Sequence, residues 1–205
     1  MRAAKGYGPK PLFFEVIKPH FSKPHNLRRL ATAFLGAACE HWLNGEVFQA
    51  IVEARPTTVP RLEWAKTDVA LFEAGTVTPE LILESKVIYS SEPLASQARR
   101  LDVLRLQLKD RIKRYPLARV VGLITYFEWT SVSSDGVETR PGRRSKRAAF
   151  PSREQRIERG LINDFGHGGK SWLNRSAPVV VQLPNHIYRV WMAMETVRAA
   201  PELAK

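Results

Sequence analysis

The chain has 205 residues, a formal net charge of +12 and an apolar content of 44%, enough to form a buried core. Its surplus of lysine and arginine points to a polyanionic partner, with nucleic acid as the first candidate. No apolar run is long enough to cross a membrane and the first residues lack the apolar segment of a signal peptide, so we expect neither membrane insertion nor secretion. Cys39 is the single cysteine, which excludes an internal disulfide and a cysteine-rich zinc site and fits a cytoplasmic protein.

The first half of the chain predicts an arm followed by helices. Residues 1–25 carry four prolines around the short apolar run LFFEVI and are expected to form a strand or an arm. Asn26 is suited to cap a helix that runs to Trp42, with Asn44-Gly45 ending it, and a second helical piece follows at 46–54. The apolar spacing predicts a buried face made of Leu27, Leu30, Ala31, Phe34 and Ala38.

Two strands joined by a hairpin are predicted next. The first runs from Leu62 to Phe72 and the second from Leu81 to Tyr89, with the turn-like stretch AGTVTP between them. If the hairpin is centred near Thr76, Asp68 lies directly opposite Glu84, because cross-strand partners in register share a face.

Charged residues interrupt the second strand at Glu84, Ser85 and Lys86, although the rest of the run is apolar. Glu84 and Lys86 share one face because side chains alternate along a strand, and the predicted register adds Asp68. Two carboxylates and an amine at one place can hold a divalent cation and activate water. The alternative is an edge strand whose charges face solvent or pair across the hairpin.

Asp68 followed by Glu84-Ser85-Lys86 resembles the motif of the PD-(D/E)XK nuclease superfamily, with Thr67 in place of the usual proline. The resemblance implies an α/β, restriction-endonuclease-like fold: a helix, a three-stranded antiparallel meander, a helix and a further strand. It also implies that Asp68 and Glu84, with the backbone carbonyl of Ser85, bind Mg²⁺, for which Mn²⁺ can substitute. Lys86 would then orient or deprotonate the attacking water, and its proximity to carboxylates favours the positioning role.

The resemblance suggests two further residues. Many members carry a helical glutamate that helps to bind the metal ion or its water, and Glu40 is the candidate, with Glu15 and Glu46 competing for the role. Gln97 resembles the glutamine of the RecB-like branch, although Leu101 stands where that branch usually has a tyrosine. Glu40 could equally be an ordinary exposed helix residue.

A long amphipathic helix is predicted over 90–115, with a basic outer face, and a buried strand over 119–129. The buried stripe of the helix consists of Leu94, Ala98, Leu101, Leu104, Leu108 and Ile112. The stretch 177–197 predicts a strand and a capped helix. The inward residues of that helix are Ile187, Val190, Trp191 and Met194.

A basic cluster marks the segment 131–160, which has turn signals and is expected to be a loop. The predicted DNA-binding residues are Arg140, Arg143, Arg144, Lys146 and Arg147. Such a cluster can neutralise several phosphates, although a solvated charged loop is the alternative. The five tryptophans are predicted to fill the core rather than to stack on bases, because basic residues do not interleave them regularly.

The predicted organisation has four parts: an N-terminal arm (1–25), a nuclease-like core (26–130), a basic loop (131–160) and a C-terminal strand and helix extension packed on the core (161–205). The predicted function is Mg²⁺-dependent hydrolysis of DNA phosphodiester bonds by an endonuclease, acting as a homodimer or with a partner subunit. The alternatives are a catalytically inactive DNA-binding or assembly protein on the same scaffold, and a nuclease specific for RNA or for branched junctions.

Overall fold

The computed structural model describes residues 12–35, 39–89, 92–132, 138–139, 174–175, 179–183 and 186–198. Their helical elements are η1 (Leu12–Ile17, a π-helical turn), α2 (Lys18–Ser22), α3 (Pro24–Leu35), α4 (Cys39–Ala54), η2 (Trp64–Lys66, a 3-10 turn) and α5 (Leu94–Arg114). Their strands are β1 (Thr58–Leu62), β2 (Val69–Glu73), β3 (Leu81–Tyr89), β4 (Arg119–Val132), β5 (Glu138–Thr139), β6 (Asn174–Arg175), β7 (Val179–Leu183) and β8 (His186–Arg198).

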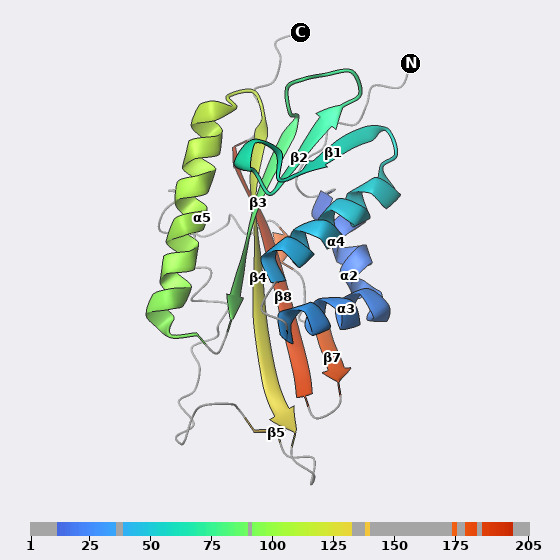
Figure 1. The fold of residues 1–205 in the computed structure, drawn as a ribbon, viewed down its shortest axis with the longest axis vertical. Coiled ribbons are helices and arrows are strands. Elements are labelled where there is room, and N and C mark those ends of the chain that lie inside the picture. Colours follow the sequence, from blue (N-terminus) through green and yellow to red (C-terminus); the bar gives the residue numbers. More distant parts are fainter. Residues whose placement is uncertain are drawn as a thin grey trace.

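The described strands form one mixed sheet in the order β1-β2-β3-β4-β8-β6, with β5 beside β4 and β7 beside β8. The first three strands form an antiparallel meander, and α5 then crosses over so that β4 runs parallel to β3 (Figure 1). The predicted α/β class is confirmed, as is the predicted strand 119–129, which lies within β4.

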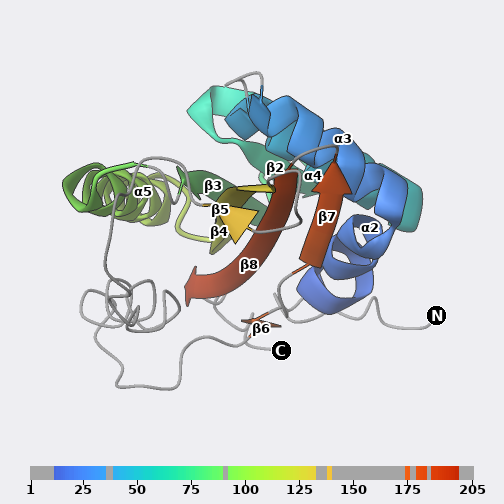
Figure 2. The same ribbon diagram turned by 90° about the horizontal axis from the view of Figure 1, so that it is seen from below.

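Helices cover the sheet on both faces. Helix α5 lies on one face, while α4 and the shorter N-terminal helices lie on the other (Figure 2). Gly122 of β4 permits close packing of α5, because a Cβ atom there would lie 3.1 Å from Leu108. Leu101, Leu104 and Leu108 are buried as predicted. Ala98 is exposed, so the predicted stripe begins too early in the helix.

The hairpin between β2 and β3 has the predicted register. Val69 pairs with Leu83 and Leu71 with Leu81, which centres the hairpin on Thr76. Continuing the same register by one residue places Asp68 opposite Glu84. The predicted centre of the hairpin is therefore confirmed by the pairs from Val69 to Leu71, and Asp68 stands one residue before the first of these pairs.

The prediction of a strand or arm at LFFEVI is wrong, because η1 and α2 are helical and belong to the core. The apolar residues that drive this packing are Leu12, Phe13, Val16 and Ile17, each no more than 3% exposed. Their spacing of four residues is a helical one, and burial against α4 and the sheet outweighs the nearby prolines.

The predicted helix boundaries also need correction. Helix α3 begins at Pro24, a residue suited to a first helical turn, and Asn26 lies inside it, donating from Nδ2 to the backbone oxygen of His20 (2.9 Å). Helix α4 runs through Asn44-Gly45 without ending there. Burial of one α4 face against the sheet offsets the helix-breaking tendency of glycine.

Two strand predictions are wrong in detail. The predicted strand Leu62–Phe72 is split by η2 into the end of β1 and β2. The predicted C-terminal helix is instead the long strand β8, which pairs with β4 along most of its length. Val190, Met192 and Met194 are buried in β8 at the two-residue spacing of a strand, so sheet pairing overrides the helix-like spacing seen in the sequence.

Candidate active site

Asp68 lies directly before β2, at the point where the pairing between β2 and β3 ends. The 3-10 turn just before it turns Thr67 away from β3, so that the backbone N–H of Thr67 donates to the oxygen of Trp64 (2.8 Å) rather than to β3. Asp68 Oδ2 accepts hydrogen bonds from the backbone N–H of Ser85 (2.6 Å) and from its Oγ (3.2 Å). The carboxylate thus replaces the partner strand at the first unpaired N–H of β3.

The backbone of Ser85 faces the same edge of β3 as Asp68, the edge along which β2 no longer pairs with β3. In a strand the N–H and C=O of one residue point to the same edge, so the carbonyl of Ser85 lies on the side of Asp68 and away from β4. Ser85 Oγ also donates to Asn44 Oδ1 of α4 (2.5 Å), which ties the strand to the helix. Asn44, predicted to end a helix, therefore supports the site.

Glu84 is fully buried on the α5 face of β3. Its Oε1 accepts a hydrogen bond from Arg111 Nε (2.5 Å), and its Oε2 is buried without a hydrogen-bond partner. Burial raises the pKa of the Glu84 carboxyl to about 7, although the hydrogen bond from Arg111 lowers it. The nearby charge of Asp68 raises the pKa of Glu84 further and that of Lys86 lowers it, so both of these predicted groups lie close enough to act on Glu84.

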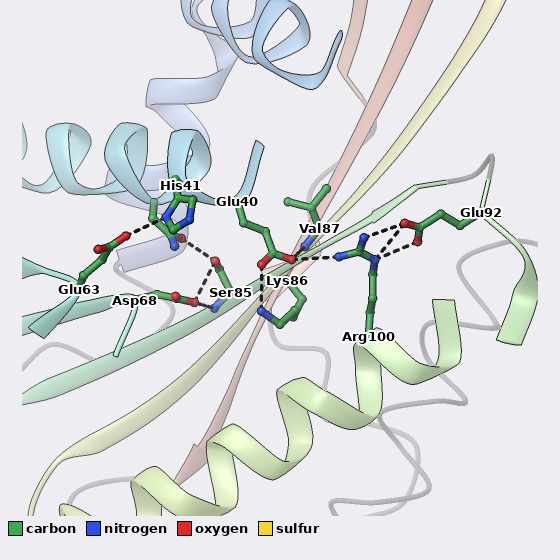
Figure 3. A network of polar contacts seen from close by, with 10 residues as sticks. Glu40, His41, Glu63, Asp68, Ser85, Lys86, Val87, Glu92 and Arg100 are labelled. Atoms are coloured by element: carbon green, nitrogen blue, oxygen red, sulfur yellow. Dashed lines mark hydrogen bonds and ion pairs between the residues drawn. The ribbon is translucent and has the colours of Figure 1, made fainter. Parts of the chain in front are cut away.

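Lys86 is joined to two helices by a chain of polar contacts (Figure 3). Its Nζ donates to Glu40 Oε2 (3.0 Å), and Glu40 Oε1 accepts from the backbone N–H of Val87 (3.4 Å). Arg100 of α5 also contacts Glu40 (3.4 Å) and binds Glu92 through two nitrogens. Only 12% of the Lys86 side chain is exposed, so the alternative of solvent-facing charges does not describe β3.

The structure brings Glu40 to the site and leaves other candidates elsewhere. Gln97 donates to the backbone oxygen of Glu92 (2.9 Å), a local contact at the start of α5. Glu15 pairs with Arg55, and Glu46 binds the buried His20 on the far side of α4. The predicted DNA-binding cluster lies outside the described residues and comprises Arg140, Arg143, Arg144, Lys146 and Arg147.

Arg111 is the residue that sequence reasoning missed. Its Nε binds Glu84, while its Nη2 donates to the backbone oxygen of Lys66, two residues before Asp68. One guanidinium therefore positions both acids. The turn that it holds is strained, with left-handed φ values at Glu63 (51°), Ala65 (49°) and Lys66 (69°).

A signal for Arg111 is present in the sequence. Arg111 follows Leu104 and Leu108 at helical spacing, so a charged residue continues the apolar stripe of α5. Charged side chains are rarely buried without a partner, so an arginine on the buried face of a helix predicts a buried acid on the strand that the helix faces. Glu84 is that acid.

The donor set fits a hard cation such as Mg²⁺. Glu84 Oε2 is buried without a hydrogen-bond partner, and the hydrogen bonds that Asp68 accepts from Ser85 both fall on Oδ2, which leaves Oδ1 out of these two contacts. In the part of the chain that the structure describes, no cluster of three or more His, Cys, Asp or Glu residues forms a ready-made cage. Mg²⁺ is commonly bound by one or two carboxylates and keeps several waters, so two acids suffice.

Comparison with known proteins returned no relatives. No protein-family model, no curated protein and no solved structure matches the chain. None of the helices in the described ranges is long and apolar enough to cross a membrane.

The raised pKa of Glu84 predicts a pH-dependent ion affinity. Below about pH 7 a proton occupies Glu84 in the metal-free protein and competes with the cation, so Mn²⁺ or Mg²⁺ affinity should rise with pH and level off above pH 7. Binding near pH 6 should release close to one proton. Isothermal titration calorimetry at pH 6 and pH 8, in two buffers of different ionisation enthalpy, measures both effects, and a pH-independent affinity would contradict the role of Glu84.

Proposed function

We propose that this chain is a metal-dependent nuclease of the PD-(D/E)XK type, with a restriction-endonuclease-like core. The observation that carries the proposal is the hairpin register, which pairs Val69 with Leu83 and, continued by one residue, would set Asp68 opposite Glu84. Lys86 follows two residues later on the same strand, and Glu40 holds its amine. The net charge of +12 supports a nucleic-acid substrate.

Each residue then has a distinct role. Asp68, Glu84 and the carbonyl of Ser85 would hold Mg²⁺, which when bound supplies Lewis-acid stabilisation of the scissile phosphate and the leaving oxygen. Lys86 would orient the attacking water, with its position fixed by Glu40. These are roles in positioning and electrostatics, which account for most of the catalysis of phosphoryl transfer.

A second candidate is a nucleic-acid-binding or assembly protein without catalysis. The observation that favours it is that the buried charges already have protein partners, since Glu84 binds Arg111 and Lys86 binds Glu40. Such pairs can be purely structural. The free Oε2 of Glu84 argues for the nuclease, because a purely structural pair would be expected to satisfy both oxygens.

An assay across substrates tests the proposal. Purified protein is incubated with supercoiled, linear, single-stranded and branched DNA and with RNA, each with Mg²⁺, with Mn²⁺ and with EDTA. We expect metal-dependent cleavage of at least one substrate, and nicking of supercoiled DNA would identify an endonuclease.

The matched variants in this assay are Asp68→Asn and Asp102→Asn. The first removes a proposed metal ligand, while the second changes an acid of α5 whose side chain is 61% exposed. We expect Asp68→Asn alone to abolish cleavage. Binding without cleavage of any substrate by the folded wild-type protein would favour the non-catalytic candidate.

A further inference from the structure

A groove with a volume of about 930 Å³ lies between α3 and α4, and none of the site's acids is among its described lining residues. Its lining includes His25, Arg28, Arg29 and Thr32 of α3 and Trp42 of α4. The side chain of Trp42 is 40% exposed, so the prediction that this tryptophan fills the core is wrong. An exposed indole in a groove lined by basic residues needs an explanation other than packing.

The indole of Trp42 is held in place from the side of α3. The guanidinium of Arg29 lies over its ring at 5.2 Å from the centroid. Arg29 is itself fixed, because its Nη2 binds the buried carboxylate of Glu46 (2.7 Å), which also accepts from His20 (2.8 Å). The indole is thus held on one face by a guanidinium that is itself bonded to a buried carboxylate, which limits how far the ring can turn before a ligand arrives.

Positive charge borders the groove. His25, Arg28 and Thr32 follow one another at spacings of three and four residues, so they line one face of α3 beside the groove. His25 and Arg28 are exposed. Among the described residues that line the groove, none has an acidic side chain. An apolar ring beside the exposed guanidinium of Arg28 and the imidazole N–H of His25 matches the two chemical parts of a nucleotide, a base and a phosphate.

The groove adjoins the candidate active site through the first turn of α4. Glu40 contacts Lys86, and Trp42 stands two residues later. Because successive helical residues are rotated by about 100°, these two side chains leave the helix in nearly opposite directions. A nucleic-acid strand that passes round the first turn of α4 could reach both the groove and the acids Asp68 and Glu84.

We propose that this groove binds an unpaired nucleotide of a single-stranded nucleic acid, with the base stacked on Trp42 and the adjoining phosphates beside Arg28 and His25. The inference rests on the proposed function, because it takes nucleic acid as the ligand. It extends that function by naming a single strand as the form of nucleic acid that the groove binds. A base within a duplex is stacked on its neighbours, so it cannot lie on the indole without being flipped out. A nucleic-acid strand supplies both a base for the indole and negative charge for Arg28, and this combination is what the groove offers to bind.

The test measures binding without cleavage. The fluorescence anisotropy of labelled oligothymidine and of a duplex of equal length is followed in EDTA at several salt concentrations. Trp42→Ala should weaken binding of the single strand about 10-fold or more, while Trp42→Phe retains most of the affinity. Arg28→Ala should lower the salt dependence for the single strand by about 0.7 in log-log slope, the value for one phosphate.

Two matched controls isolate the groove. Arg61→Ala on β1 removes one exposed charge that also lies over an aromatic ring, that of Phe72 at 4.8 Å, but far along the sheet from α3. Val77→Ala removes exposed apolar surface from the β2 and β3 loop, where the side chain is 89% exposed. Both should bind the single strand within about twofold of wild type. Circular dichroism melting curves check that every variant is folded.

The outcomes separate this inference from the proposed function. Unchanged single-strand binding by Trp42→Ala, or an equal loss for the duplex, would overturn the stacking role and leave the groove to another partner. Loss of binding by both Trp42→Ala and Trp42→Phe would also overturn it, because an aromatic ring should suffice. If Trp42-dependent binding is observed but no substrate is cleaved with any metal, the inference stands and the nuclease proposal fails.

Discussion

Lys86→Ala is expected to lower the rate of Mg²⁺-dependent cleavage by at least about 100-fold, the effect of removing one preorganised electrostatic group from an active site. Lys86 stands two residues after Glu84 on β3, and its Nζ is held at 3.0 Å from Glu40. Removing the amine leaves both proposed metal-binding acids in place but removes the group that we propose orients the attacking water. Nucleic-acid binding should stay within a few-fold of wild type, because one charge of a strongly basic chain is lost.

Single-turnover cleavage and anisotropy binding, measured on the same preparations, separate these two effects. Lys113→Ala is the matched control, since it removes an exposed lysine from α5 outside the site. It should cleave at the rate of wild type. Undiminished cleavage by Lys86→Ala would remove Lys86 from the mechanism, and equal losses in the two variants would point to general electrostatics.

Arg111→Met is expected to reduce the free energy of unfolding by about 3–5 kcal/mol at pH 8, the usual cost of leaving one partner of a buried ion pair uncompensated. Glu84 is fully buried, and Arg111 is 5% exposed. The guanidinium also holds the strained turn before Asp68 through the backbone oxygen of Lys66. Urea unfolding followed by circular dichroism measures the loss.

The loss should shrink at pH 5. Because the pKa of folded Glu84 is raised to about 7 from an ordinary value of 4.5, its carboxyl is protonated in the fold at pH 5 and needs no counter-ion. The folded state binds the extra proton between these two values, so the contribution of Glu84 to stability is greatest below about pH 4.5 and is lost as the pH rises through 7. Arg111→Met should therefore be most damaging above pH 7.

Matched variants make this test specific. Arg114→Met changes an arginine of the same helix that is 47% exposed and pairs with Asp110 at 3.2 Å, and it should cost less than about 1 kcal/mol. Adding Glu84→Gln to Arg111→Met should recover part of the lost stability, because the unpaired buried charge is then removed. A pH-independent loss, or no recovery in the double variant, would show that Arg111 acts through packing alone.

Local patterns predicted the part of the site that depends on one hairpin. The length of the spacer between two apolar runs is enough to set the register around Thr76, and the pairing of Val69 with Leu83 bears out that centre. The same patterns predicted α5 and β4, because a long apolar stripe and a continuous apolar run leave few alternatives. Glu40 came from the resemblance rather than from any pattern.

Residues that act across elements could not be found in this way. Arg111 and Asn44 each contact β3 from a helix more than 25 residues away in sequence, and no local periodicity encodes such a contact. The exposure of Trp42 depends on how α3 and α4 pack, and apolar composition alone suggested the opposite. In β8, long pairing with β4 decided between two spacings that the sequence fits about equally well.

The sequence by itself determined the α/β class and the β2 and β3 hairpin, because these follow from short-range spacing and turn chemistry. It also singled out Asp68, Glu84 and Lys86 as the charged residues in or beside the two apolar runs. Only the tertiary structure decided that α5 supplies the partner of Glu84 and α4 the partner of Lys86. It also decided that Asp68 binds the free backbone N–H of Ser85 on β3, and that Trp42 faces a basic groove. The physical reason is that burial and ion pairing depend on the distance between side chains in space. That distance is set when both layers of helices pack on the sheet.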